Sequence, residues 1–129
     1  MSITTPGISR KVITVGCSDD DREVLVGGNR MVDYSGRGPT AACICKPDLV
    51  APGCSVVSCA GRADKYTIKS GTSMSTPIVS GATALLLERY PDMTNKDVKL
   101  KLRESCTDIG LPRNQQGWGL LDVEKLVSK

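Results

Sequence analysis

The chain lacks histidine altogether, so it has neither an imidazole general base nor a histidine metal ligand. It also lacks phenylalanine, and aromatic residues make up only 3% of its 129 residues. A hydrophobic core must therefore be built from aliphatic side chains and cysteine. Because 40% of the residues are hydrophobic and 24% are charged, the composition is that of an ordinary globular protein, and the length predicts one domain or part of one.

A strong charge excess and a long apolar run are missing too. The net charge is +3, and the lysines and arginines are scattered without an aromatic platform beside them, which argues against a nucleic-acid partner. The longest nearly apolar run, residues 78–87, is too short to span a bilayer, and the first residues show no signal-peptide pattern. The sequence therefore predicts neither a nucleic-acid nor a membrane partner.

Six cysteines are present, an even number that allows three disulfides in a secreted protein. Their spacing does not match a zinc signature, because Cys43 and Cys45 are too close together and no histidine is available. Reduced thiols that act as small buried residues are the simpler interpretation, and they favour a cytoplasmic location.

The first half of the chain is typical of short strands separated by turns. A β-branched run at 12–15 predicts a buried strand, and residues 23–26 are a candidate for a second one. Residues 48–51 form a brief apolar run closed by Pro52 and Gly53. Two further runs, at 56–59 and 66–69, flank a glycine-containing turn and predict a hairpin.

The second half predicts helices. Between 74 and 90 the chain is small or apolar on every side, which predicts a buried helix with its large side chains at helical spacing: Met74, Ile78, Ala82, Leu85 and Leu86. Thr94 and Asp97 form a capping-box variant that opens a second helix, and Asp122 is positioned to cap a last one. Strands followed by helices indicate an α/β layered structure.

Ser73 lies between the predicted hairpin and the predicted buried helix. A serine at a helix N-terminus is close to unpaired N–H groups, which can stabilise the oxyanion that develops on a bound carbonyl. The same position also suits a helix cap, because serine and threonine are preferred there. The local pattern alone leaves both interpretations open.

The wider sequence resembles the subtilisin-like serine proteases of the S8 family. Residues 71–77, Gly-Thr-Ser-Met-Ser-Thr-Pro, resemble the family signature around the nucleophilic serine. Four further segments resemble family motifs in the same order, so the resemblance covers essentially the whole chain: residues 12–16, 34–38, 46–53 and 117–122. The resemblance implies that Ser73 is the nucleophile and that Ser70, Gly71 and Thr72 line the floor of the substrate cleft.

The resemblance also implies an α/β fold. Residues 1–129 would be the C-terminal part of a three-layer α/β/α catalytic domain with a mostly parallel sheet. No cofactor is expected; calcium is common in the family, but most of its ligands lie upstream, so no metal site is assigned here. The substrates would be peptides or proteins.

The catalytic Asp and His and the oxyanion-hole Asn lie upstream in the family, and none of them is present in these 129 residues. The chain alone is therefore expected to be an inactive part of a serine endopeptidase. It would need the missing N-terminal half, or would self-associate through its exposed sheet edge. The alternative is a non-catalytic binding or scaffold module derived from the fold, and an upstream coding sequence with the Asp and His motifs would distinguish the two.

Overall fold

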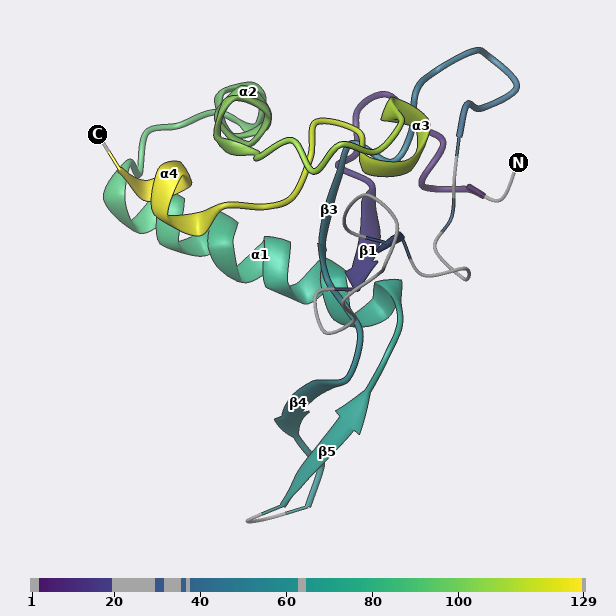
Figure 1. Ribbon diagram of the computed structural model, residues 1–129. Coiled ribbons are helices and arrows are strands. Elements are labelled where there is room, and N and C mark those ends of the chain that lie inside the picture. The colour runs from purple at the N-terminus through teal and green to yellow at the C-terminus, as the bar shows by residue number, and fades with distance from the viewer. Residues whose placement is uncertain (1–2, 20–29, 32–35, 37, 63–64, 129) are drawn as a thin grey trace.

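The computed structural model describes residues 3–19, 30–31, 36, 38–62 and 65–128. Strands dominate the first half and helices the second, as the sequence predicts (Figure 1). The strands are β1 (Val15–Asp19), β2 (Arg30–Met31), β3 (Leu49–Pro52), β4 (Val56–Cys59) and β5 (Tyr66–Lys69). The helices are α1 (Thr72–Arg89), α2 (Asn95–Ser105), α3 (Arg113–Gln116) and α4 (Val123–Val127). The predicted strand at 23–26 lies outside the described residues.

A three-stranded sheet in the order β2-β1-β3 forms the centre of the fold. β1 and β3 are parallel, with Val15 opposite Leu49, whereas β2 is antiparallel to β1. β3 carries most of the buried sheet core, since Leu49, Val50 and Ala51 are fully buried. The fold is thus mixed α/β with a parallel strand pair, as predicted.

The first strand begins later than the sequence pattern predicts, at Val15 instead of residue 12. The Thr14 amide donates to the Asp48 carboxylate at 2.8 Å, and the Thr14 carbonyl accepts from the Asp48 amide at 2.8 Å. The Thr14 hydroxyl donates to the Gly7 carbonyl. The acceptor for the Thr14 amide is thus a carboxylate instead of a backbone carbonyl of a neighbouring strand. The regular pairing of β1 with β3 therefore starts at the next residue, Val15.

A buried ion pair lies just before β3. The Lys46 ammonium is 2.7 Å from the Asp48 carboxylate and donates to the Val12 carbonyl at 2.9 Å. The Lys46 side chain is only 1% exposed, so both charges depend on these partners. The pair ties the segment before β1 to the segment before β3.

α1 packs its face of small and aliphatic residues on β1 and β3, and α4 packs against both α1 and α2. The prediction of a helix buried on every side is wrong. Only one stripe is buried, and Leu85 is 50% exposed. The buried residues are Ser75, Val79, Ala82 and Leu86, a spacing of three or four that keeps them on one face. The described residues cover that face and leave the opposite one open.

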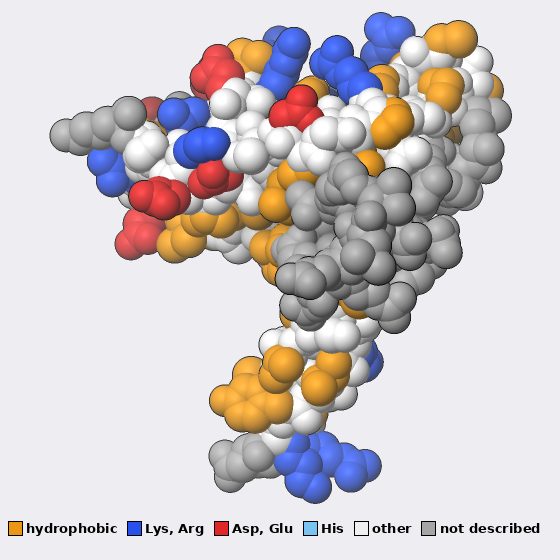
Figure 2. All heavy atoms as spheres, viewed as in Figure 1, with side chains coloured by type: hydrophobic (Ala, Val, Ile, Leu, Met, Phe, Trp, Pro, Cys, Tyr) orange, Lys and Arg blue, Asp and Glu red, His pale blue; other side chains and the backbone are white. Residues whose placement is uncertain are grey.

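β4 and β5 form the predicted hairpin, which projects from the body of the molecule (Figure 1). Val57 pairs with Ile68, and Cys59 pairs with Tyr66 two positions further along, so these four residues share one face. Val57, Tyr66 and Ile68 are 63%, 74% and 66% exposed. Figure 2 shows this apolar surface on the hairpin, with lysine and arginine side chains near the tip.

The C-terminal elements follow their capping residues. The Thr94 hydroxyl accepts from the Asp97 amide while the Asp97 carboxylate accepts from the Thr94 amide, which completes the predicted capping box of α2. Asp122 accepts from the Lys125 amide and caps α4. The short α3 was not predicted; it ends at Gly117, whose φ of 61° is a left-handed conformation that favours glycine. A Cβ on Gly117 would overlap the Asp48 carbonyl.

All six cysteines lie in the described part of the chain, and none is in a disulfide. The prediction that they are small buried residues holds for Cys17 only. Cys43, Cys45 and Cys59 are exposed because they lie in a loop and at the end of a hairpin strand, away from the core. Within the described residues, we find no helix long and apolar enough to cross a membrane.

Candidate active site

Ser73 is the second residue of α1, and its side chain is exposed. The helix cap is Gly71, whose carbonyl accepts from the amides of Met74 at 2.9 Å and Ser75 at 3.4 Å. Side-chain capping plays no part at this helix end. Ser73 is therefore not a helix cap, and the local alternative that the sequence left open is wrong.

The amides of Thr72 and Ser73 have no acceptor among the described residues. In an α-helix the first N–H groups have no partner within the helix and point out of its end. The partial positive charge of the helix N-terminus adds to their attraction for an anion. A carbonyl oxygen placed beside Ser73 would meet these donors, so the arrangement can stabilise negative charge next to a hydroxyl.

The start of α1 is fixed to the end of β3. The Gly71 amide donates to the Gly53 carbonyl at 2.7 Å. The fully buried Ser75 hydroxyl donates to the carbonyl of Ala51 at 2.9 Å and lies 3.1 Å from that of Pro52. Because both contacts flank Ser73 in sequence, they hold its backbone against the sheet.

The role of Ser75 was not predicted from the sequence. Its position four residues before the buried Val79 places it on the core stripe of α1, and this spacing was the available signal. The close packing of Gly53 against the start of α1 was not predicted from the sequence either. A Cβ at Gly53 would overlap the Ser75 hydroxyl and the Cys17 thiol and approach the Gly71 carbonyl to 2.7 Å.

The other predicted site residues lead into Ser73 from the hairpin. The Ser70 hydroxyl accepts from the Ser55 amide at 2.8 Å, which closes the base of the hairpin. Gly71 has a φ of 149°, a conformation that side chains rarely adopt. The Thr72 carbonyl accepts from the Thr76 hydroxyl at 3.0 Å. The structure thus brings Ser70, Gly71 and Thr72 together with Ser73 in one continuous turn.

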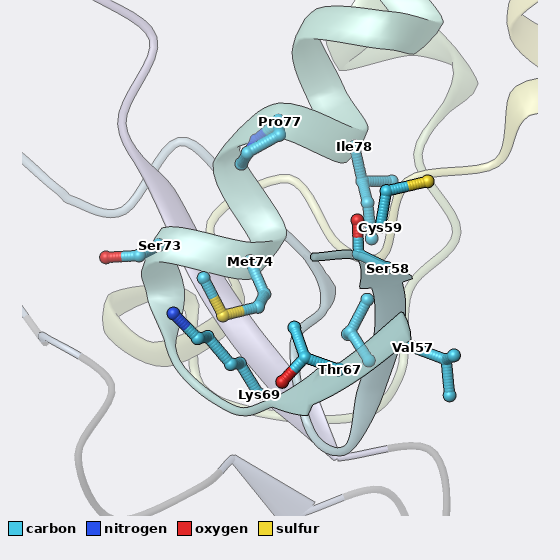
Figure 3. Close-up of a pocket in the computed structure, with 10 residues that line it drawn as sticks. Val57, Ser58, Cys59, Thr67, Lys69, Ser73, Met74, Pro77 and Ile78 are labelled. Carbon is cyan, nitrogen blue, oxygen red and sulfur yellow. The ribbon is translucent and has the colours of Figure 1, made fainter. Parts of the chain in front are cut away.

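A groove of about 470 Å³ runs between the hairpin and the first turns of α1. Figure 3 shows Ser73, Met74 and Lys69 at one end, and Val57, Cys59 and Ile78 at the other. The lining is otherwise small and neutral: Val56, Ser58, Thr67 and Pro77. A groove of this size beside an exposed hydroxyl suits an extended peptide or a side chain.

The described residues of the groove do not include a carboxylate or an imidazole that could act as a general base. Lys69 and Cys59 are the ionisable residues among the described lining. A search of the described residues also found no cluster of three metal-ligating side chains. The described residues of the groove therefore offer a hydroxyl and hydrogen-bond donors, but no carboxylate or imidazole to take the proton from the hydroxyl.

Comparison with known proteins gives a consistent result. The sequence profile of the subtilase family matches residues 1–119. Serine protease AprX of Bacillus subtilis is 38% identical over an alignment of 120 residues, and the match covers 83% of this chain and 27% of AprX. The halolysin-like extracellular serine protease Nep of Natrialba magadii is 32% identical over 127 residues, 98% of this chain and 21% of Nep. The chain thus spans about a quarter of the length of these relatives.

The solved structure of the CspB protease of Clostridium perfringens has the same fold. It superimposes with a TM-score of 0.80 at 30% identity, covering 97% of this chain and 28% of that one. The expected subtilisin-like α/β fold is thereby confirmed.

The expected cytoplasmic location is wrong. Among the relatives, Nep is an extracellular protease by name, and its match covers almost the whole length of this chain. The expectation rested on unpaired cysteines, but thiols without disulfides can persist in either compartment when they are not placed to pair.

Two independent lines of evidence support one assignment. The motif around Ser73 folds into a turn and helix start that expose its hydroxyl. The family profile covers all but the last ten residues, since it ends at residue 119 of 129. The chain belongs to the subtilase family.

Proposed function

We propose that Ser73 is the nucleophile of a serine endopeptidase and that this chain supplies the nucleophile-bearing part of its catalytic domain. The observation that carries the proposal is the exposed Ser73 hydroxyl beside the unpaired amides at the start of α1. In the reaction, the hydroxyl oxygen attacks a peptide carbonyl, and the carbonyl oxygen becomes an oxyanion facing those amides. Collapse of this intermediate releases the amine product and leaves an acyl group on Ser73, which water then removes.

Ser70, Gly71 and Thr72 form the cleft floor in this proposal. Gly71 has no side chain, so a peptide backbone can approach the turn closely. Ser70 is already engaged with the Ser55 amide, which makes its role the positioning of the turn. The substrates are peptides or proteins, in keeping with the names of the relatives as proteases.

The 129 residues alone are proposed to be inactive and to be the C-terminal segment of a catalytic domain. A serine hydroxyl is a weak nucleophile without a positioned base. Loss of a triad member leaves only ~10³–10⁴-fold catalysis over water, from the oxyanion hole and substrate binding. The loss of one oxyanion-hole donor costs a further factor of ~10²–10³. An N-terminal segment that supplies Asp, His and the second donor is therefore the required partner.

Complementation tests this proposal. The purified chain is mixed with an N-terminal subtilase fragment that carries the Asp and His motifs, and hydrolysis of a fluorogenic peptide is followed. We expect the mixture to hydrolyse the peptide while each part alone does not, and Ser73→Ala to abolish the activity of the mixture. Hydrolysis by the lone chain would overturn the claim of inactivity. Equal activity of Ser73→Ala and wild type in the mixture would overturn the assignment of the nucleophile.

A further inference from the structure

Among the described residues that line the groove beside Ser73, a single side chain carries a full charge. Lys69 lies at the Ser73 end, and the remaining lining residues are aliphatic, hydroxyl- or sulfur-bearing (Figure 3). The described lining residues do not include a carboxylate, so none of them compensates the charge of Lys69. A ligand that enters this groove therefore meets one positive charge on an otherwise neutral wall.

Lys69 is also available to a ligand. It is the last residue of β5, four positions before Ser73, and its side chain is exposed. Among the described residues, it forms neither an ion pair nor a side-chain hydrogen bond. The one acidic residue in the hairpin turn, Asp64, lies outside the described residues.

Lys69 borders the groove directly, together with its strand partner Val56. Ser58 and Thr67, the pair two positions further along, lie on the same face of the hairpin and also line the groove. Val57 and Cys59, on the opposite face, border it as well. Lys69 is thus one of several hairpin residues around the groove, and the only one among those described that carries a full charge.

We propose that Lys69 makes this groove select peptides with an acidic side chain. The acidic residue would lie one or two positions from the scissile bond, on the side of the substrate that passes over the hairpin. An extended peptide advances about 3.3 Å per residue. A peptide whose carbonyl carbon meets the Ser73 hydroxyl thus places its next side chains over the groove that contains Lys69. This inference rests on the proposed function, because it assumes that the substrate crosses Ser73.

The size of the effect follows from the exposure of Lys69. An exposed ion pair contributes about 0.2–1 kcal/mol, which is a factor of about 1.5–5 in affinity. The preference is therefore a modest one that added salt weakens. Reversal of the charge at position 69 is expected to change the ratio of the affinities for an acidic and a neutral peptide by about the square of that factor, which is large enough to measure.

Fluorescence anisotropy of labelled peptides on the full 129-residue chain tests the proposal. Three blocked pentapeptides are used that differ only in a central Glu, Gln or Lys. For the wild type we expect the Glu peptide to bind about 1.5- to fivefold more tightly than the Gln peptide, and the Lys peptide to bind most weakly. Lys69→Glu is expected to reverse this order, and Lys69→Met to remove most of it.

Lys65→Glu is the matched control. Lys65 precedes β5, is exposed, and does not line the groove, but its substitution changes the net charge by the same amount. The order of the three peptides should survive in Lys65→Glu. Circular dichroism of each variant shows whether the fold is retained, and Lys69→Met gives a second, less disruptive test if Lys69→Glu does not fold.

Three outcomes would overturn the proposal. They are equal binding of the three peptides, an unchanged order in Lys69→Glu, and an equal loss of preference in Lys65→Glu. Absence of peptide binding by the wild type would also count against it. The Ser73→Ala variant keeps these outcomes separate from the proposed function, since it should retain the peptide preference while it loses hydrolysis in the complemented enzyme.

Discussion

At the scale of single residues, Gly53 matters most for the geometry of Ser73. A methyl group there would overlap the Ser75 hydroxyl and the Cys17 thiol and press on the Gly71 carbonyl, which lie next to the turn that leads into Ser73. We expect Gly53→Ala to destabilise the chain by about 1–3 kcal/mol, as overpacked cores do. Urea unfolding followed by circular dichroism measures this.

Gly81→Ala is the matched control for that substitution. Gly81 lies inside α1, and a methyl group there would have open space around it. Alanine in a helix interior is more stable than glycine by about 0.5–1 kcal/mol, so Gly81→Ala should raise the urea midpoint. If Gly53→Ala were as well tolerated as Gly81→Ala, the close packing behind Ser73 would be refuted.

Cys106 gives a second prediction at the residue scale. Burial raises the pKa of its thiol to about 11, with a further contribution from the nearby Asp122 carboxylate. Only about one Cys106 in a thousand is then a thiolate at pH 8, and the thiolate is the form that reacts. Alkylation by iodoacetamide, followed by mass spectrometry, should label the exposed Cys45 well before Cys106. Equal labelling rates at pH 8 would contradict the burial of Cys106.

The proposal that Ser73 is the nucleophile could be made from the sequence because its motif is specific, but the contacts that hold its backbone could not be predicted. The motif gives residue types in order, whereas the Ser75 bond to Ala51 joins positions that are distant in sequence. Lys46 shows the same limit, since its sequence context does not predict that an ammonium is fully buried against a carboxylate and the Val12 carbonyl. Such contacts depend on how β1 and β3 come together.

At the scale of elements, the starts of α2 and α4 were the most predictable features. Thr94 with Asp97 and Asp122 with Lys125 are local hydrogen-bond patterns, so the sequence identified them directly. The hairpin was predictable for the same reason. The start of β1 was not, because the Asp48 carboxylate replaces a strand partner at Thr14. The burial of α1 was overestimated because small and apolar residues occur on both faces of the helix, whereas the described part of the chain covers only one face.

The capping box of α2 can be tested by substitution and by pH. Hydrogen bonds from the Thr94 hydroxyl and amide lower the pKa of Asp97 below its usual 3.8. A lowered carboxylate pKa stabilises the fold above pH 3.8, and this contribution is lost as the pH falls through the folded pKa. We expect Thr94→Ala to cost about 1 kcal/mol at neutral pH.

The measurement for this prediction is urea unfolding of Thr94→Ala and wild type from pH 7 down to pH 3. The difference between the two proteins should begin to shrink below pH 3.8, because protonation of Asp97 removes the charge that the Thr94 hydroxyl stabilises in the wild type. A difference that stays constant over the whole range would show that Asp97 does not take part in the cap.

At the scale of the whole molecule, the chain exposes an apolar surface that its own described residues do not cover. Val57, Tyr66 and Ile68 on the hairpin and Leu85 on α1 are each at least half exposed. Such a surface promotes association. We expect the isolated chain to elute from a size-exclusion column as dimers or larger species that dissociate on dilution.

The double variant Val57→Thr and Ile68→Thr checks the source of that association. Threonine keeps the β-branched shape that suits a strand but removes apolar surface. The variant should shift the elution towards the monomer. A wild-type chain that stays monomeric across a dilution series would contradict the expected self-association.

The central claim is that Ser73 is a nucleophile that depends on a base from outside these 129 residues. Labelling by a fluorophosphonate, with mass spectrometry to locate the adduct, tests this claim most directly. The account predicts negligible labelling of the lone chain and rapid labelling at Ser73 once an N-terminal subtilase fragment with Asp and His is added. Rapid labelling of the lone chain at Ser73, or an adduct on another residue in the mixture, would contradict it.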